Sequence, residues 1–162
     1  MRSRKKPDTE AGPPGPEEVR DHALRLLARR EHSTLELERK LLQRGYSPEL
    51  IESTLSGLAA EGLLSETRYA GEWVRSRIAR GQGPAKIRTE LRHRGLTDAQ
   101  IRQALAAAEV DWGRLAAEVR RKRFGAALPA SLVERARQTR FLEARGFTAE
   151  HIRQALGGPS PE

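Results

Sequence analysis

The sequence predicts an all-α protein that is an array of one repeated helical unit. One skeleton of apolar, arginine, glycine and hydroxyl residues occurs three times, at steps of 50 and then 51 residues, and self-similarity at a fixed period is typical of repeat architectures. No stretch alternates apolar and polar residues beside Asn-Gly or Asp-Gly turns, so strands are not expected. Such an array favours an extended binding surface over a pocket. The three copies of the skeleton are Leu41, Arg44, Gly45, Tyr46, Ser47, Ile51 and Leu55; Leu91, Arg94, Gly95, Leu96, Thr97, Ile101 and Leu105; and Leu142, Arg145, Gly146, Phe147, Thr148, Ile152 and Leu156.

The residue type at each position of the skeleton is explained by local backbone structure at the end of one helix and the start of the next. The glycine fits the left-handed position just past a helix end, where a Cβ would be strained. The Ser or Thr two residues later accepts backbone N–H bonds as the N-cap of the next helix. The isoleucine at the fourth position of that helix packs against the apolar residue before the cap, a hydrophobic staple that sets the angle between the two helices. The three corners therefore depend on Gly45, Ser47 and Ile51, on Gly95, Thr97 and Ile101, and on Gly146, Thr148 and Ile152.

The chain divides into an arm, three repeats and a short tail. Residues 1–16 end in a run of Gly and Pro and contain too little apolar surface to offset ordering entropy, so a disordered basic arm is expected. The repeats cover residues 17–64, 65–109 and 110–158, and residues 159–162 form the tail. Each repeat is near the size at which one core is only marginally stabilising, so neighbouring repeats are expected to share buried surface.

The first repeat is predicted to contain one helix from about Glu17 to Arg30. Ser33 and Glu36 form a capping box for a second helix that stops at the first skeleton glycine. The third helix starts from Ser47.

The other two repeats have the same pattern of helix caps and glycine stops, except for a longer connection in the third repeat. Ser65 caps a helix that ends at Gly81, Pro84 opens the next helix, and Thr97 with Gln100 forms another capping box. In the third repeat, residues 125–130 replace the tight turn of the second repeat. The helix after this connection is three residues longer than its counterparts and is capped by Ser131 and Glu134, while the preceding helix is capped by Asp111.

Composition excludes several classes of protein. The chain contains no cysteine, which removes disulfides, cysteine metal sites and thiol catalysis. No segment approaches the roughly 20 apolar residues that span a bilayer. The basic start is followed by Pro and Gly rather than by an apolar segment, so a cytoplasmic protein without membrane contact is expected.

The titratable residues form no catalytic or metal-binding constellation. The histidines stand in four different segments without a partner at ligand spacing, so each is expected to be an ordinary surface residue. Glu17, Glu18 and Asp21 begin a helix, where the macrodipole favours carboxylates, and an acid pair for catalysis is not expected there. A phosphate-binding glycine loop is absent. We therefore expect no enzyme, no metal and no cofactor. The histidines are His22, His32, His93 and His151.

The formal net charge of +8 is distributed unevenly along the chain. Residues 17–66 carry −3, whereas residues 67–109 and residues 110–158 carry +5 each; the first 16 residues carry +2 and the last four −1. The first repeat is therefore acidic and the other two are basic. A gradient of this kind favours orientation along a polyanion or a strongly charged partner.

The densest basic stretch spans a turn between two helices of the second repeat, and its one acidic residue is Glu90. A solvated helical surface usually interleaves acids, so binding is favoured here, with plain solvation as the alternative. A second basic run occupies consecutive positions of a helix and points all round it, so part of this run serves solubility alone. The candidate partner-binding residues are Arg75, Arg77, Arg80, Lys86, Arg88 and Arg92 in the first stretch and Arg120, Arg121 and Lys122 in the second.

Three helices with a tight turn before the last are similar to a helix-turn-helix, whose second helix enters the major groove of DNA. Here acidic residues such as Glu49 and Asp98 would meet phosphate first, which disfavours sequence-specific reading. Contact with single-stranded or double-stranded DNA would be to the backbone and would depend strongly on salt. Trp73 and Trp112 are expected to be core anchors rather than platforms for base stacking.

Four strings in order resemble the RecX family of bacterial recombinase regulators, over residues 18–157. This resemblance implies three tandem three-helix repeats in an elongated, curved, all-α protein. It also implies a function, because RecX-like proteins bind the RecA recombinase in the groove of its nucleoprotein filament and restrain ATP hydrolysis, strand exchange and repressor cleavage. The strings are Leu26-Leu27-Ala28-Arg29-Arg30-Glu31-His32-Ser33; Tyr69-Ala70 with Trp73-Val74-Arg75-Ser76-Arg77; Gly81-Gln82-Gly83-Pro84 with Ile87 and Glu90-Leu91; and Arg140-Phe141-Leu142 with Arg145-Gly146-Phe147.

Two function hypotheses from different classes follow. The first is a monomeric RecA-binding regulator of recombination, DNA repair and the SOS response, with the central contact in the second repeat. The alternative is a nonspecific DNA-binding protein that acts without RecA. A nuclease is a distant third.

Overall fold

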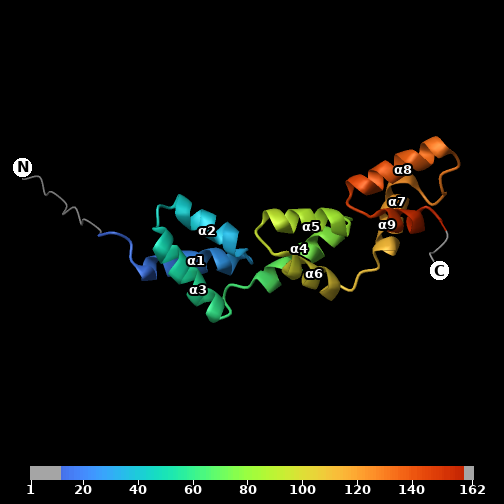
Figure 1. Cartoon of the computed structure of the whole chain (residues 1–162). Helices are drawn as coiled ribbons and strands as arrows, with labels where there is room; N and C mark the ends of the chain where they lie inside the picture. Colours follow the sequence, from blue (N-terminus) through green and yellow to red (C-terminus); the bar gives the residue numbers. More distant parts are fainter. Residues whose placement is uncertain (1–11, 159–162) are drawn as a thin grey trace, which may run out of the picture. The chain divides into compact units, whose positions relative to one another are not determined.

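The computed structural model describes residues 12–158, which form helices joined by connections without strand structure (Figure 1). This part of the chain contains nine helices, as an all-α class requires, and none of them is long and apolar enough to cross a membrane. Most of the predicted arm (residues 1–11) and the predicted tail (residues 159–162) lie outside the described residues. The helices are α1 (Pro16–Arg29), α2 (Thr34–Gln43), α3 (Pro48–Ala60), α4 (Glu66–Ala79), α5 (Pro84–His93), α6 (Asp98–Ala107), α7 (Trp112–Phe124), α8 (Leu132–Ala144) and α9 (Ala149–Ala155).

The chain forms two compact units, the first ending at Leu64 and the second beginning at Ser65. In the first unit α1, α2 and α3 all pack against one another. Their apolar stripes meet in one core, because each helix alone would leave its stripe in water. The core consists of Val19, Ala23, Leu37, Leu41, Tyr46, Ile51, Leu55, Leu58 and Leu64.

The second unit contains α4–α9 and has two hydrophobic clusters. Trp73 packs against the first cluster and Trp112 against both, in agreement with their predicted role as core anchors. The first cluster consists of Tyr69, Ala70, Val74, Ile87, Leu91, Leu96, Ile101 and Leu105. The second consists of Ala116, Leu142, Phe147, Ile152, Ala155 and Leu156.

Most helices begin at a side-chain cap, as the sequence predicts. The box of Thr97 and Gln100 is complete, since the Thr97 amide also donates to the Gln100 Oε1 atom at 2.8 Å. The predicted box of Ser33 and Glu36 is only half formed, because the Glu36 carboxylate binds Arg30 instead of the Ser33 amide. The caps are Ser33, Ser47, Ser65, Thr97, Asp111, Ser131 and Thr148.

The three skeleton glycines have left-handed backbone angles. Gly45, Gly95 and Gly146 have φ values of 87°, 89° and 93°, a region that carries a steric cost for residues with a Cβ. The Leu96 amide then donates to the Leu91 carbonyl at 3.2 Å, which is the hydrogen bond of a Schellman stop. The isoleucines of the three staples are buried.

Backbone contacts join the second repeat to the third within the second unit. The Gly83 amide donates to the Arg145 carbonyl at 2.7 Å, and the Ala85 amide donates to the Gly146 carbonyl at 2.9 Å. The two segments are so close that a Cβ on Gly83 would lie 2.4 Å from the Gly146 carbonyl carbon. The turn before α5 and the corner after α8 therefore form one joint.

Two histidines are not surface residues, which corrects the expectation for them. His22 is 7% exposed and His32 is 2% exposed, and burial lowers the pKa of both imidazoles. The His22 Nδ1 atom lies 3.2 Å from the Tyr46 hydroxyl oxygen. The sequence did not reveal the burial of His22 because its partner Tyr46 is 24 residues away, in the connection between α2 and α3.

Candidate partner-binding surface

The nine candidate basic residues all belong to the second unit, but their exposure differs. Six side chains reach solvent, two are half-buried and one is buried. The exposed residues are Arg75, Arg80, Lys86, Arg92, Arg121 and Lys122, the half-buried ones are Arg77 and Arg88, and the buried one is Arg120.

Four side chains from the α4–α5 stretch make no ion pair within residues 12–158: Arg75, Arg80, Lys86 and Arg88. The Arg92 Nη2 atom lies 2.9 Å from Asp98 Oδ1, but both side chains are more than half exposed. Exposed pairs of this kind contribute little to stability, so a partner can compete for Arg92 as well. The α4–α5 stretch therefore presents uncompensated positive charge.

Arg77 has an internal role in a cluster around Trp73. The Trp73 Nε1–H donates to Glu90 Oε2 at 3.1 Å, and the Arg77 Nε atom lies 3.2 Å from the same oxygen in an ion pair without hydrogen-bond alignment. The guanidinium carbons of Arg77 and Arg94 lie 4.0 and 3.9 Å from the Trp73 ring centroid, within the range of cation–π attraction. Arg77 thus ties α4 to α5 and is not a free contact residue.

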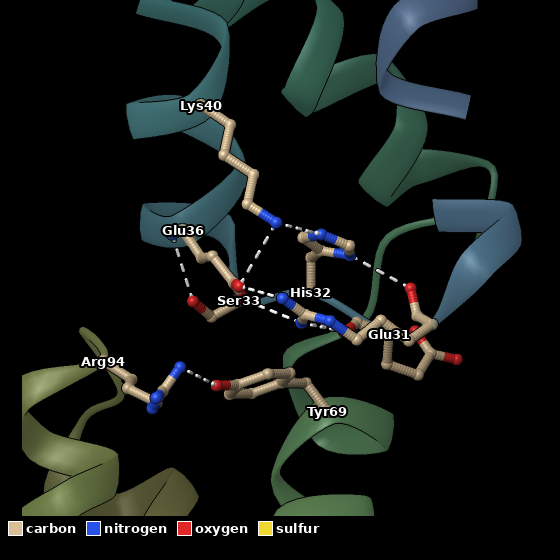
Figure 2. Close-up of polar contacts among 8 residues, drawn as sticks. Glu31, His32, Ser33, Glu36, Lys40, Tyr69 and Arg94 are labelled. Carbon is tan, nitrogen blue, oxygen red and sulfur yellow. Dashed lines mark hydrogen bonds and ion pairs between the residues drawn. The ribbon is translucent and has the colours of Figure 1, made fainter. Parts of the chain in front are cut away.

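Arg94 completes this link between α4 and α5. Figure 2 shows its side chain directed at the Tyr69 hydroxyl, to which the Arg94 Nη1–H donates at 3.1 Å. Tyr69 is buried in the core of the second repeat and lies beside Trp73. The packing of α5 on α4 therefore fixes the spacing of the exposed arginines.

Arg120 does not fit the expectation of a partner contact. It is 3% exposed, and its guanidinium donates to the Ala127 carbonyl at 3.1 Å, to the Ala126 carbonyl at 3.3 Å and to Gln138 Oε1 at 3.4 Å. These bonds hold the long connection before α8 against α7. Arg120 is therefore a structural residue of the irregular third repeat, while its neighbours Arg121 and Lys122 remain exposed.

Two hollows of the second unit are lined by candidate residues. Arg75 lines a groove of about 480 Å³ beside α4 and α6, whose other walls are mainly small apolar side chains. Arg80 and Lys122 line a cavity of about 270 Å³ where the second repeat meets the third. The fold thus brings together cations from the two basic stretches.

The first unit carries a polar cluster of a different kind. Figure 2 shows the Lys40 ammonium between His32 and Glu36, with distances of 2.9 Å to His32 Nε2 and 3.6 Å to Glu36 Oε1. Because His32 Nε2 accepts from Lys40, its Nδ1–H donates to the Arg30 carbonyl at 3.0 Å. Burial alone would raise the pKa of the Glu36 carboxyl, but the hydrogen-bonded Arg30 guanidinium, helped by the Lys40 ammonium, lowers it to about 2. These groups satisfy one another, and no cluster able to hold a metal ion occurs in residues 12–158.

Known proteins match this chain over most of its length. Models of the first, second and third three-helix domains of RecX match residues 20–58, 65–105 and 113–156. A regulatory protein RecX from Halorhodospira halophila is 54% identical over 139 residues, which cover 86% of each chain. The chain belongs to the RecX family. A regulatory protein RecX from Pseudomonas putida is 50% identical over 143 residues, 88% of this chain and 92% of that one.

The RecX fold extends to distant relatives. The crystal structure of RecX from Lactobacillus salivarius has a TM-score of 0.74 and 20% sequence identity to this chain, covering 86% of it and 93% of the other chain. This likeness establishes the all-α fold of three three-helix domains. The RecX family is one of regulatory proteins and not of enzymes.

Within this RecX-family chain, three further arginines contribute to this surface. Arg94 and Arg123 belong to the two basic stretches but not to the candidate set, and Arg145 lies outside both stretches. Arg94 stacks on Trp73, while Arg123 and Arg145 line the cavity between the second and third repeats. A signal for two of them was available, since Arg94 and Arg145 occupy the same skeleton position, one residue before a helix-ending glycine. The remaining arginine at this position, Arg44, is exposed, so the repeated arginine packs in two of the three repeats.

Proposed function

We propose that this RecX-family protein binds the RecA filament on single-stranded DNA, in the groove of the filament, and inhibits RecA. The inhibited activities are ATP hydrolysis, strand exchange and the coprotease reaction. Through them the protein modulates recombination, DNA repair and the SOS response. Membership of the RecX family carries this proposal, because the resemblance implies RecA as the partner.

The charge of the second unit supports the proposal. A filament of RecA and DNA offers both phosphates and acidic protein side chains. The cations Arg75, Arg80, Lys86 and Arg88 make no ion pair in the described part of the chain, so binding does not first have to break internal ion pairs. Charge of this kind speeds encounter with an anionic partner and makes it sensitive to salt.

The test is steady-state ATP hydrolysis by RecA on single-stranded DNA, with increasing amounts of this protein. Wild type is expected to lower turnover, and the double substitution Arg75→Glu with Arg88→Glu is expected to raise the half-inhibitory concentration at least about tenfold, since two contacts become repulsive. The matched control is Arg140→Glu with Arg153→Glu, which makes the same change of net charge at exposed residues outside the candidate set.

Arg77 is left unchanged in this design because its substitution would disturb the Trp73 cluster. A wild-type protein that leaves RecA turnover unchanged would contradict the regulator function. Equal loss of inhibition in the test variant and the control would contradict the assignment of the surface.

A further inference from the structure

The joint between the second and third repeats carries a cavity that is open to solvent and has a strongly cationic lining. Its volume is about 270 Å³. Four basic side chains line it, Arg80 from the end of α4, Lys122 and Arg123 from the last turn of α7, and Arg145 from the end of α8. The single carboxylate in the lining is Glu118. We infer that this cavity binds a phosphate group of a nucleic-acid backbone.

The charges of the lining are poorly compensated. Arg80 and Lys122 are exposed and make no ion pair within residues 12–158. Arg123 contacts the ring of its neighbour Phe124, with its guanidinium carbon 5.4 Å from the ring centroid, and also lacks an acidic partner in that range. Glu118 pairs with Arg114 at 3.4 Å, so its charge is partly offset on the other side.

The cavity is held in place by the backbone contacts of the joint. The Arg145 Nη1–H donates to the Arg80 carbonyl at 3.0 Å, and the Arg145 guanidinium carbon lies 5.2 Å from the Phe141 ring centroid. The hydrogen bonds of Gly83 and Ala85 to the corner after α8 keep the two sides together. The Arg145 guanidinium is thereby held in place, and such a donor loses less side-chain entropy on binding than a free surface arginine does.

The arrangement favours a phosphate backbone over an acidic protein segment. A further exposed cation outside the cavity, Lys86, lies against Gly146 at the same joint. A polymer with a phosphate at every residue can meet cations inside and outside the cavity in one register, and releases counterions at each. The apolar wall, which includes Phe141 and Val119, suits the sugar next to a phosphate. This inference deepens the proposed function, on which it rests, because the RecA filament carries single-stranded DNA.

The test uses the full chain and a fluorescein-labelled oligothymidylate, with affinity measured by fluorescence anisotropy over a series of salt concentrations and without RecA. Lys122→Glu and Arg80→Glu are each expected to weaken binding about tenfold and to reduce the slope of log affinity against log salt by about 0.7. The matched control is Arg121→Glu, which makes the same charge change on the same helix at an exposed residue outside the cavity lining. It is expected to weaken binding much less.

Equal weakening in Lys122→Glu and Arg121→Glu would overturn the inference, because net charge alone would then govern binding. Unchanged DNA binding with lost inhibition of RecA would also overturn it, since the cavity would then receive an acidic protein segment. The neutral variant Lys122→Gln, checked by circular dichroism, covers the case in which a charge reversal disturbs folding. Failure of the proposed function would look different: wild type would not inhibit RecA while the difference between Lys122 and Arg121 persisted.

Discussion

At the scale of single residues, arginines that the sequence places in the same basic stretches have very different roles. Arg120 is buried under the connection before α8, Arg77 stacks on Trp73 beside Glu90, and Arg75 is exposed without an acidic partner in the described part of the chain. A guanidinium that is desolvated and hydrogen-bonded inside a protein stabilises the fold and is costly to withdraw. The sequence indicated where positive charge accumulates. It did not indicate which charges are available, because the groups that cover Arg77 and Arg120 are brought in by packing.

The pKa of Glu36 predicts a loss of stability in acid. Because its pKa in the folded protein is about 2, against 4.5 for the free side chain, the unfolded state binds a proton more readily. The stabilisation by Glu36 is therefore complete above about pH 4.5 and is lost as the pH falls towards 2, in total about 3 kcal/mol. Thermal unfolding followed by circular dichroism between pH 6 and pH 2.5 measures it.

In Glu36→Gln this part of the pH dependence should disappear. The control is Glu52→Gln, an exposed residue of α3, which should retain it. Identical pH profiles for wild type and Glu36→Gln would contradict the assigned ion pair with Arg30.

At the scale of elements, the helix boundaries were predictable because their causes are local. Each cap and each glycine stop depends on a few consecutive residues, as at Thr97 and Gly95. The joint between the second and third repeats was not predictable in the same way. Its side-chain bond from Arg145 to the Arg80 carbonyl spans 65 positions, and no local pattern records such a contact.

Two glycines of the second unit are predicted to respond in opposite ways to replacement by alanine. One lies where two backbone segments approach closely, and the other lies inside a helix with space around it. Gly83 has an ordinary φ of −85°, yet a Cβ there would meet the backbone of Gly146 and Phe147 at 2.4 to 2.5 Å. Gly83→Ala is therefore expected to destabilise the second unit by about 3 kcal/mol. Gly71, inside α4, has only the flexible end of Arg75 nearby, at 3.3 Å, so Gly71→Ala is expected to stabilise by about 0.5 to 1 kcal/mol.

Urea unfolding followed by tryptophan fluorescence measures both changes, because Trp73 and Trp112 belong to the second unit. If Gly83→Ala were as stable as wild type, the joint would be looser than the backbone hydrogen bonds indicate. The inferred phosphate cavity would then lose its rigid frame.

At the scale of the whole molecule, the charge gradient separates the two units. The first unit has no net charge and its polar cluster around His32 is internally satisfied, whereas the second unit carries the whole excess of +8. The all-α class and the RecX family could both be predicted from the sequence, because the repeated pattern and the family motifs consist of residues that are close together along the chain. The repeat boundaries and the curvature of the array stay predictions. The candidate functional surface could not be predicted from the sequence, because only the fold brings Arg80 and Lys122 to one cavity.

Electron microscopy of RecA filaments on single-stranded DNA, with and without this protein, tests the central claim most directly. Added density along the filament groove is expected in the presence of wild type, and this density should be lost with Arg75→Glu and Arg88→Glu together but not with the control pair at Arg140 and Arg153. Filaments that look the same with and without the wild-type protein, at concentrations well above those of RecA, would contradict this claim.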